Sequence, residues 1–404
     1  MKNNKKKTLK KTQRKSSIKK TSKKYYYIVK SKYLDNDFVR KTMKKRKIWE
    51  EFNIKKPQQE NPDFIHIDQH YSNDKSLWKY KASLQSQVDI NSDDSLINKY
   101  NLIESLKKLN KPKLDKMLLE QHLIDLYLVF KKRKNLKSLE GLFTNNRVWI
   151  LKFIYGHAGQ NIIIIKNFEE LTQYLGKIIK KNIGKWSKLN YKKYQNMSKW
   201  TKSYYFVEWV LQEYITEPML VEKKKFHLRG YYLYNNKSGK NREGFLLDNH
   251  RVFTAKLSYK KDDYLNKDIH DTHLSSTSKY INFKPDILEL VPKSKRNQLI
   301  KDINYLFKNV LEITKNSCYS QNKNCYQLFG SDIMITNDYK IKMIEVNTSV
   351  GLPDYKDNIK KINHPYTIFE GVLENIVDKQ FPPLIDNFKK SKKSALKKSQ
   401  FIKL

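Results

Sequence analysis

Three oxygen-bearing side chains, Asp332, Glu345 and Asn347, lie within or at the end of otherwise apolar runs. The runs read "QLFGSDIMIT" and "KIKMIEVN", and we expect both to be strands. Residues two apart on a strand share a face, so Glu345 and Asn347 should point the same way. The two runs are close enough in sequence to form a hairpin.

The hairpin predicts a cation site. If residues 337–340 form a four-residue loop, Thr336 faces Ile341 and Asp332 faces Glu345. Two opposed carboxylates repel unless a cation lies between them. Hard oxygen ligands suit Mg²⁺, which takes its remaining ligands from water and phosphate. The alternative is an ordinary hairpin with a solvent-facing polar face, because charged strand faces are common.

A glycine-containing loop upstream could approach a phosphate. In "KFIYGHAGQNII", Lys152 leaves a strand, and Gly156 and Gly159 allow backbone N–H groups to come close to an anion. Two glycines and a lysine also occur by chance in many basic chains, so this motif alone is weak. With the hairpin it indicates a site for Mg²⁺ and a phosphorylated ligand.

The elements around these motifs predict mixed α/β layers. Apolar spacing of three and four predicts helices at 101–110, 114–132, 167–181, with Asn167 as N-cap, and 292–314. Polar stretches around 57–97 are expected to be loops. Strands are expected at 25–31, 147–155, 161–166, 205–215, 225–234, 246–256, 327–336 and 340–347.

Charge dominates the composition. The chain has 82 Lys and Arg against 41 Asp and Glu, a net charge of +41 over 404 residues, which favours polyanionic partners. Residues 1–24 hold twelve Lys and Arg and no acid, and we expect them to be disordered. The stretch 180–202 is basic with interspersed Trp and Tyr. It is read as a surface loop, or as a grip for an acidic tail or nucleic acid.

The two cysteines, Cys318 and Cys325, fit no zinc pattern and are expected to be reduced. No segment approaches the ~20 apolar residues of a membrane span, and the N-terminus lacks the apolar core of a secretory signal. These features predict a cytoplasmic protein without a membrane partner.

Together the motifs resemble the tubulin–tyrosine ligase-like family, which has an ATP-grasp fold, over roughly residues 99–388. The family's Phe-Gly-x-Asp and Ile/Leu-Glu-Val-Asn stand here as "FGSDIMITNDYKIKMIEVN". Its adenine-side motif is similar to "LQEYITEPML", its Lys-Phe-Asp-Ile/Leu-Arg to "KFHLR", and its His-Leu-Thr-Asn to "HLSS".

The resemblance implies an α/β (α+β) fold whose domains enclose a nucleotide cleft. The expected division is an N-terminal domain at 25–98, a central domain at 99–203 with a basic insertion at 180–202, and a C-terminal domain at 204–388. Basic tails at 1–24 and 389–404 would flank them.

The resemblance also implies roles for individual residues. Asp332, Glu345 and Asn347 would hold Mg²⁺ on the phosphates of ATP. Lys152 and Lys225 would contact phosphates, with Lys107 a further candidate. Arg229 would orient phosphate or the acceptor carboxylate, and with Lys225 and Glu345 it forms the expected catalytic group. The other residues expected to contact the nucleotide are Gly156, Gly159, Gln212, Glu213, Tyr214, Ile215, His227, Ser275 and Ser276.

Several positions depart from the family pattern, and each departure removes a contact to ATP or substrate. The family's arginine on the strand after "KFHLR" has no clear match, since Phe253 takes its place and Arg251 lies one strand-step away. The other departures are His227 for Asp, Ser275 and Ser276 for Thr-Asn, Ala158 and Asn161 for the loop's lysine and glycine, and Glu213 for the adenine-side lysine.

The implied reaction is amide ligation. ATP phosphorylates a terminal or γ-carboxylate of the acceptor, and the amine of a free amino acid attacks the acylphosphate. The implied partner is the acidic C-terminal tail of tubulin or a similar protein. Tyrosine is favoured as the added amino acid by the compact end of the chain, with polyglutamylation and glycylation as alternatives. A catalytically impaired microtubule-binding protein is the second hypothesis, and a nucleic-acid binder, based on charge alone, is the third.

Overall fold

The structure of the chain is a computed structural model. It describes residues 24–30, 35–67, 75–86, 88–89, 96, 98–156, 161–237, 241–272, 282–314, 317–318, 324–348, 350, 365–381 and 401–404. The expectations for residues 1–23 and 389–400 of the basic tails, and for Gly159, Ser275 and Ser276, lie outside the described residues.

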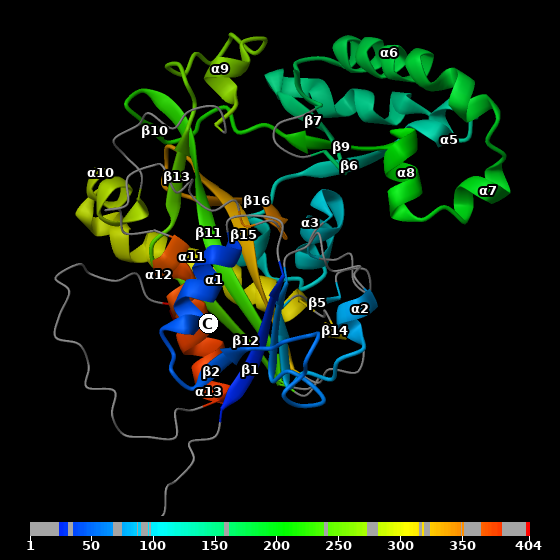
Figure 1. Cartoon of the computed structure of the whole chain (residues 1–404). Coiled ribbons are helices and arrows are strands. Elements are labelled where there is room, and N and C mark those ends of the chain that lie inside the picture. Colours follow the sequence, from blue (N-terminus) through cyan, green and yellow to red (C-terminus); the bar gives the residue numbers. More distant parts are fainter. Residues whose placement is uncertain are drawn as a thin grey trace, which may run out of the picture.

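Strand β11 (Lys224–Lys237) is central to an 11-stranded mixed sheet (Figure 1). Every residue of β11 except its two end residues is buried, because both faces of the sheet are covered. The other strands of this sheet are β1 (Tyr25–Lys30), β2 (Trp49–Glu51), β3 (Phe64–Ile67), β4 (Leu84–Ser86), β10 (Leu220–Val221), β12 (Asn241–Leu247), β13 (Arg251–Thr254), β15 (Cys325–Ile335), β16 (Ile341–Asn347) and β17 (Phe401–Lys403).

Segments from both ends of the chain join this sheet. Strand β4 pairs in parallel with β15, and β17 pairs antiparallel with β12. Arg46, which follows α1, donates to Asp378 of α13 at 2.8 Å and so connects two segments far apart in the sequence. The last residues, which were expected to belong to a tail, therefore form a strand. The helices at this end are α1 (Asp35–Lys44), α12 (Pro365–Val372), η4 (Leu373–Val377) and α13 (Asp378–Gln380).

Helices α3 (Lys99–Lys107) and α11 (Lys293–Ile313) contribute to the largest core of the described chain. Leu102 and Leu306 are fully buried there with Phe329 and Ile333 of β15. Shorter elements complete this part of the molecule: α2 (Lys75–Trp78), β5 (Val88–Asp89), α4 (Pro112–Asp115), α9 (Lys267–His270), η3 (Phe283–Ile287), α10 (Leu288–Leu290) and β14 (Ser317–Cys318).

A second sheet has four antiparallel strands in the order β6-β9-β7-β8 (Figure 1, upper right). Its core contains the buried Trp149, Trp186 and Trp209. Its strands are β6 (Gln121–Asp125), β7 (Trp149–Phe153), β8 (Ile162–Ile165) and β9 (Glu208–Glu213). The helical elements beside it are α5 (Leu126–Phe130), η2 (Leu136–Asn146), α6 (Phe168–Ser187), α7 (Tyr191–Gln195) and α8 (Lys199–Tyr205).

The predicted mixed α/β architecture is confirmed, and most predicted elements are present. Asn167 caps α6 as expected, because its side chain accepts from the Glu170 amide at 2.8 Å. Helices α3 and α11 and the paired strands β15 and β16 also lie where the sequence predicts them.

Four local predictions are wrong. A single helix at 114–132 does not form, since β6 pairs with β9 in the middle of this stretch. The expected loop at 180–202 is helical, because Trp186 and Tyr194 pack into the core of the second sheet. The single strand at 246–256 is interrupted by residues 248–250, and both halves pair with β11. The loops expected around 57–97 contain β3 and β4, which extend the large sheet.

Cys318 and Cys325, which are expected from the sequence to be reduced, form a disulfide. Strand β14 ends at Cys318, and β15 begins at Cys325. Their Cα atoms are 5.5 Å apart, within the range that a disulfide requires. The prediction was wrong because sequence spacing does not reveal that these two strand ends lie together.

Among the helices of the described ranges, each is either too short or too polar to cross a lipid bilayer.

Candidate active site

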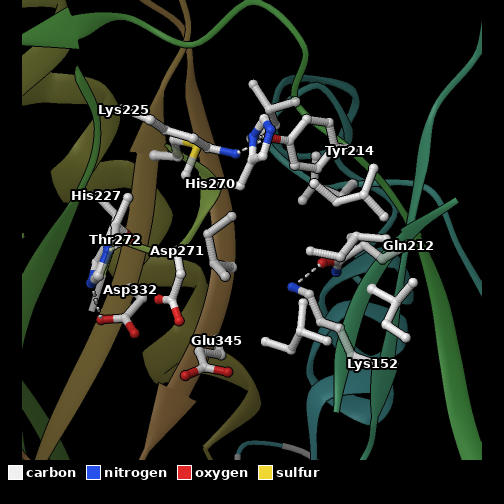
Figure 2. A pocket seen from close by; sticks show the side chains of 18 of the residues that line it. Lys152, Gln212, Tyr214, Lys225, His227, His270, Asp271, Thr272, Asp332 and Glu345 are labelled. Atoms are coloured by element: carbon white, nitrogen blue, oxygen red, sulfur yellow. Dashed lines mark hydrogen bonds and ion pairs between the residues drawn. The ribbon is translucent and has the colours of Figure 1, made fainter. Parts of the chain in front are cut away.

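A cavity of about 350 Å³ is lined by residues of both sheets (Figure 2). Strands β7, β8 and β9 supply one wall, and β11, β15 and β16 supply the opposite wall. Residues 264–272, which include α9, close one end. The glycine-loop lysine and the carboxylate hairpin, which are far apart in the sequence, therefore meet in one place.

The β15–β16 hairpin places two carboxylates opposite one another. Asp332 pairs with Glu345 in register, as the sequence predicts, but the turn differs from the prediction. Ile335, not Thr336, faces Ile341, and the register shifts by one residue between Asp332 and Ile333. Without this shift Glu345 would lie opposite Ser331.

The register shift is a β-bulge, and it explains the burial pattern of β16. Ile341 and Met343 are buried in the core before the bulge, and Val346 is buried after it. Ile344 and Glu345 both line the cavity, because two residues of a bulged strand oppose one residue of the partner. The extra residue thus lets β16 keep its apolar face in the core while it presents a carboxylate to the cavity.

Arg229 of β11 holds Asp332 from behind. Its Nη2 donates to Asp332 Oδ2 at 3.0 Å, its Nε bonds the other carboxylate oxygen, and its Nη1 donates to the Val350 carbonyl at 2.9 Å. Arg229 is buried and does not line the cavity. The guanidinium that was expected to orient a substrate therefore orients a carboxylate of the protein.

Gly330 makes this packing possible. A Cβ at position 330 would lie 2.9 Å from the Val350 oxygen and 3.0 Å from Arg229 Cδ. Such contacts are too close for any side chain, so the glycine of the Phe-Gly-x-Asp motif has a packing reason.

Glu345 is surrounded by positive charge. Lys99 Nζ lies 3.4 Å from one carboxylate oxygen, and the Asn347 amide donates to the other at 2.7 Å. Burial would raise the pKa of Glu345, but Lys99, Asn347 and Lys152 together lower it well below its usual range. The Glu345 carboxylate is therefore ionised at neutral pH. Lys99 Nζ also donates to the Gly156 carbonyl at 2.7 Å and so connects the glycine loop to the hairpin.

Lys152 faces the carboxylates from the opposite wall (Figure 2). Its Nζ donates to Gln212 Oε1 at 2.9 Å. Burial lowers the pKa of Lys152 to about 8, against the attraction of Glu345, which favours the charged form. An anion that entered the cavity would raise the pKa of Lys152 again, because a second opposite charge favours the ammonium.

Lys225 lies at the other end of the cavity, next to α9 (Figure 2). Its Nζ donates to the Tyr214 hydroxyl at 2.8 Å and lies 3.9 Å from the centre of the Tyr214 ring. Burial and, to a lesser degree, the charge of Lys152 lower the pKa of Lys225 to about 7. Tyr214 in turn bonds His270 at 2.7 Å.

His227 lies two residues after Lys225 on β11. Its Nδ1 bonds Thr272 Oγ1 at 2.5 Å, and its Nε2 is 3.7 Å from Asp332 Oδ1. The ring stacks on Phe253 at 5.0 Å between centroids. His227 therefore joins the carboxylate wall to the segment that closes the cavity.

Most of the predicted site residues that the structure describes converge on this cavity. Lys107 does not, since its Nζ pairs with Glu104 at 3.1 Å outside the cavity. Arg229 and Asn347 contact the site through Asp332 and Glu345. Those that line the cavity are Lys152, Gly156, Gln212, Glu213, Tyr214, Ile215, Lys225, His227, Asp332 and Glu345.

Several polar residues that line the cavity were not predicted from the sequence: Lys99, Tyr264, Lys267, His270, Asp271 and Thr272. Lys99 is the first residue of α3, and the helix pattern was visible, but its contact with Glu345 spans 246 positions. His270 and Asp271 follow a stretch rich in Tyr, Lys and Asp that carries no motif. Only the folded chain shows that this stretch closes the cavity.

The donor set fits a magnesium–phosphate ligand. Two carboxylates, one of them held ionised, lie on one wall and a buried lysine on the other. Groups of three or more His, Cys, Asp or Glu arranged for a metal are absent from the described ranges. A divalent cation here would thus depend on Asp332, Glu345, the Asn347 amide and the ligand's own oxygens, as is usual for Mg²⁺ with nucleotides.

Comparison with known proteins gives a family match. The model of the tubulin-tyrosine ligase family matches residues 83–387, three quarters of the chain. The matched range contains every cavity-lining residue described above.

Individual relatives are distant. A Schizosaccharomyces pombe protein named probable tubulin–tyrosine ligase is 25% identical over 189 residues, 44% of this chain and 43% of the relative. A Caenorhabditis elegans protein named probable tubulin polyglutamylase is 23% identical over 249 residues, 56% of this chain and 53% of the relative. A tubulin polyglutamylase of Mus musculus is 28% identical over 204 residues, 44% of this chain and 26% of the relative. The chain thus spans about half of the first two relatives and a quarter of the third.

Proposed function

Because the chain belongs to the tubulin–tyrosine ligase family, we propose that it is an ATP-dependent carboxylate–amine ligase that adds an amino acid to the acidic C-terminal tail of tubulin or a similar protein. The observation that supports this most strongly is the juxtaposition of Asp332 and Glu345 with the buried Lys152 across one cavity. Cytoplasmic localisation and microtubule association belong to the same proposal.

The proposed role of each residue follows from its position in the cavity. Asp332, Glu345 and Asn347 would hold Mg²⁺, which would neutralise the phosphate oxygens of ATP during transfer. Lys152 would contact the phosphates from the opposite wall, and Arg229 holds the Asp332 carboxylate in place through two hydrogen bonds. Gln212, Glu213, Tyr214 and Ile215 border the base, on the wall away from the carboxylates.

The proposed reaction has two steps. An acceptor carboxylate oxygen attacks the γ-phosphorus of ATP, the bond to the β–γ bridging oxygen breaks, and ADP leaves. The amine of the free amino acid then attacks the acyl carbon, phosphate leaves with the bonding electron pair, and the nitrogen loses one proton, which the released phosphate can take up. Exclusion of water during the reaction would protect the acylphosphate from hydrolysis.

The identity of the added amino acid is decided by a transfer experiment. Tyrosine is our first choice, and the relatives include proteins named for glutamate addition as well as for tyrosine ligation. Purified protein should therefore be incubated with tubulin, Mg²⁺, ATP and labelled Tyr, Glu or Gly in separate reactions. Incorporation of one label, dependent on ATP, is the expected result. No transfer with any of the three contradicts a tubulin ligase.

Glu345→Gln separates an active ligase from a binding protein that has lost catalysis. We expect wild-type protein to be stabilised by Mg–ATP, by about 2.7 kcal/mol at a hundredfold excess over Kd. The variant should lose both this stabilisation and label transfer, because it removes one of two carboxylates beside the phosphates. Tubulin co-sedimentation without any ATP stabilisation in the wild type would instead support the catalytically impaired microtubule-binding protein.

A further inference from the structure

The segment Leu257–Thr272, the cap segment hereafter, closes one end of the cavity and is fastened to strand β11. Tyr264, Leu265 and Lys267 of this segment line the cavity. Its backbone is tied to the residue before β11, since the Tyr259 amide donates to the Lys223 carbonyl at 2.7 Å. Its last residue, Thr272, bonds His227. The cap segment thus contacts the ligand space and the cavity wall together.

His270 of the cap segment has one defined tautomer when it is neutral. Its Nε2 lies 2.8 Å from the Asp263 carbonyl oxygen, which can only accept, so Nε2 carries the proton. Nδ1 is then an acceptor, and the Tyr214 hydroxyl donates to it at 2.7 Å. The Tyr214 oxygen accepts from Lys225 at 2.8 Å. These hydrogen bonds form a directed relay from the cap segment to the lysine.

We propose that His270 and Tyr214 are positioning residues that hold the Lys225 ammonium at the cap end of the cavity, where it meets the bound nucleotide. This inference rests on the proposed function, because the ligand concerned is Mg–ATP. A lysine side chain has four rotatable bonds, and fixing it costs conformational entropy. The hydroxyl and the ring face of Tyr214 fix the ammonium in advance, and His270 fixes Tyr214.

Aromatic packing holds His270 in place. Its ring stacks on Tyr264 at 5.7 Å and meets the edges of Tyr214 at 5.8 Å and of Tyr259 at 5.7 Å. Tyr259 is anchored in turn, because its hydroxyl donates to the Thr216 carbonyl at 2.8 Å. The imidazole therefore has a fixed orientation from which Nδ1 faces Tyr214.

The hydrogen-bonded relay makes nucleotide binding sensitive to acid. Protonation of His270 would turn Nδ1 into a donor and place two cations against the oxygen of Tyr214. Burial lowers the pKa of His270, and the Lys225 charge lowers it further, while the Asp263 carbonyl opposes both. The contact is therefore intact at neutral pH and is lost as pH falls through this lowered pKa. The titratable groups around His270 are Tyr214, Lys225, Tyr259 and Tyr264, with Asp263, Lys267, Asp268 and Asp271 on its own segment.

Mg–ATP binding, measured by calorimetry between pH 5.5 and 8, tests the proposal with two variants of His270. His270→Ala should raise the Kd for Mg–ATP by about three- to tenfold at pH 7.5, which is the loss of affinity expected when one hydrogen bond is removed. His270→Asn places an oxygen where Nδ1 was and cannot titrate. We expect it to restore wild-type Kd within about twofold at pH 7.5 and to abolish the weakening of binding in acid.

The controls distinguish this inference from the proposed function. His122→Ala changes a histidine outside the cavity and should leave Kd and its pH profile unchanged. If the wild type binds Mg–ATP and His270→Ala binds equally well at every pH, the positioning role is excluded. If His270→Asn keeps the wild-type acid profile, the role of His270 protonation is excluded. If the wild type binds no Mg–ATP at all, the proposed function fails first.

Discussion

At the level of single residues, the cavity has Asp332 and Glu345 on one wall and Lys152 on the facing wall, and each of these three side chains contacts a partner side chain. Arg229 holds Asp332, and Lys99 holds Glu345. On the facing wall Gln212 holds Lys152. Because each carboxylate has a cationic partner, the repulsion expected from their register is offset without a bound cation. Burial disfavours the charge of Lys152, so an anionic ligand beside it would be stabilising.

Lys152→Met therefore should weaken Mg–ATP binding with no loss of stability. We expect Kd to rise by about tenfold or more, since hydrogen bonds to charged groups contribute about 1.5–3 kcal/mol. Without ligand the melting temperature should stay constant or rise, because the variant removes a buried charge. Calorimetry and thermal melting check the two halves of this prediction.

Lys107→Met is the informative comparison for this test. The family resemblance makes Lys107 a candidate for phosphate contact, whereas the structure pairs it with Glu104 outside the cavity. We expect its effect on Kd to be much smaller than that of Lys152→Met. An equal loss in both variants would show that Lys107 reaches the nucleotide.

At the level of helices and strands, two local features stand out: the bulge in β16 and the packing of β17. The bulge at Ile344 lets β16 bury its apolar residues and still present Glu345. The strand β17 closes the edge of the large sheet beside β12 and packs Phe401 against helix α12. This contact joins β17 to helix α12 at the edge of the sheet.

Two glycine-to-alanine changes test the packing of β17. A Cβ at Gly371 of α12 would lie 2.8 Å from Phe401 Cδ2, and we expect Gly371→Ala to destabilise the protein by roughly 1–3 kcal/mol. At Gly176 of α6, a Cβ would have no atom of the described residues within 4 Å, so Gly176→Ala should stabilise by about 0.5–1 kcal/mol. Denaturant unfolding measures both. Destabilisation by the two changes alike would contradict the docking of Phe401 on α12.

Across the molecule as a whole, positive charge is concentrated as well as abundant. No acidic residue occurs between Glu170 and Glu208, a range that contains nine lysines and forms α6, α7 and α8. The apolar sides of these helices are buried in the second sheet's core, so the lysines face outwards. We call this the basic helical face. The exposed lysines that define it are Lys177, Lys180, Lys181, Lys185, Lys188, Lys192 and Lys193.

We expect the basic helical face to bind a glutamate-rich peptide in a salt-dependent manner. Replacing Lys180, Lys181, Lys192 and Lys193 by Ala should weaken peptide binding about fivefold or more at low salt, and the loss should shrink near 0.5 M salt, where screening is strong. Fluorescence anisotropy with a labelled peptide measures this.

The matched control removes the same charge elsewhere. Lys293, Lys295, Lys301 and Lys308 are exposed on α11, and their replacement by Ala gives the same net charge. If both quadruple variants lose affinity equally, binding depends on net charge alone and the basic helical face has no special role.

Much of the fold could be predicted because local patterns were strong. Three features depend on residues close together in the sequence: the apolar periodicity of α11, the Asn167 cap and the β15–β16 pair. They could therefore be predicted without knowledge of the rest of the fold. The failures occurred where tertiary contacts override local preference. Residues 121–125 have a helical apolar spacing, yet they form strand β6 because they pair with β9 at the edge of the second sheet. The charge of residues 180–202 predicts an irregular loop, yet Trp186 and Tyr194 are buried and fold this stretch into helices.

Residue types and short spacings were enough to show which chemistry the protein could carry: two carboxylates and an amide at strand ends, a lysine before a glycine loop, and an ordered set of motifs. Which charges meet became clear only in the folded chain, because contacts such as Lys99 with Glu345 and His270 with Tyr214 join segments far apart in sequence. The folded chain also shows that Arg229 hydrogen-bonds the Asp332 carboxylate. Long-range pairing depends on how the two sheets pack, which no local pattern encodes.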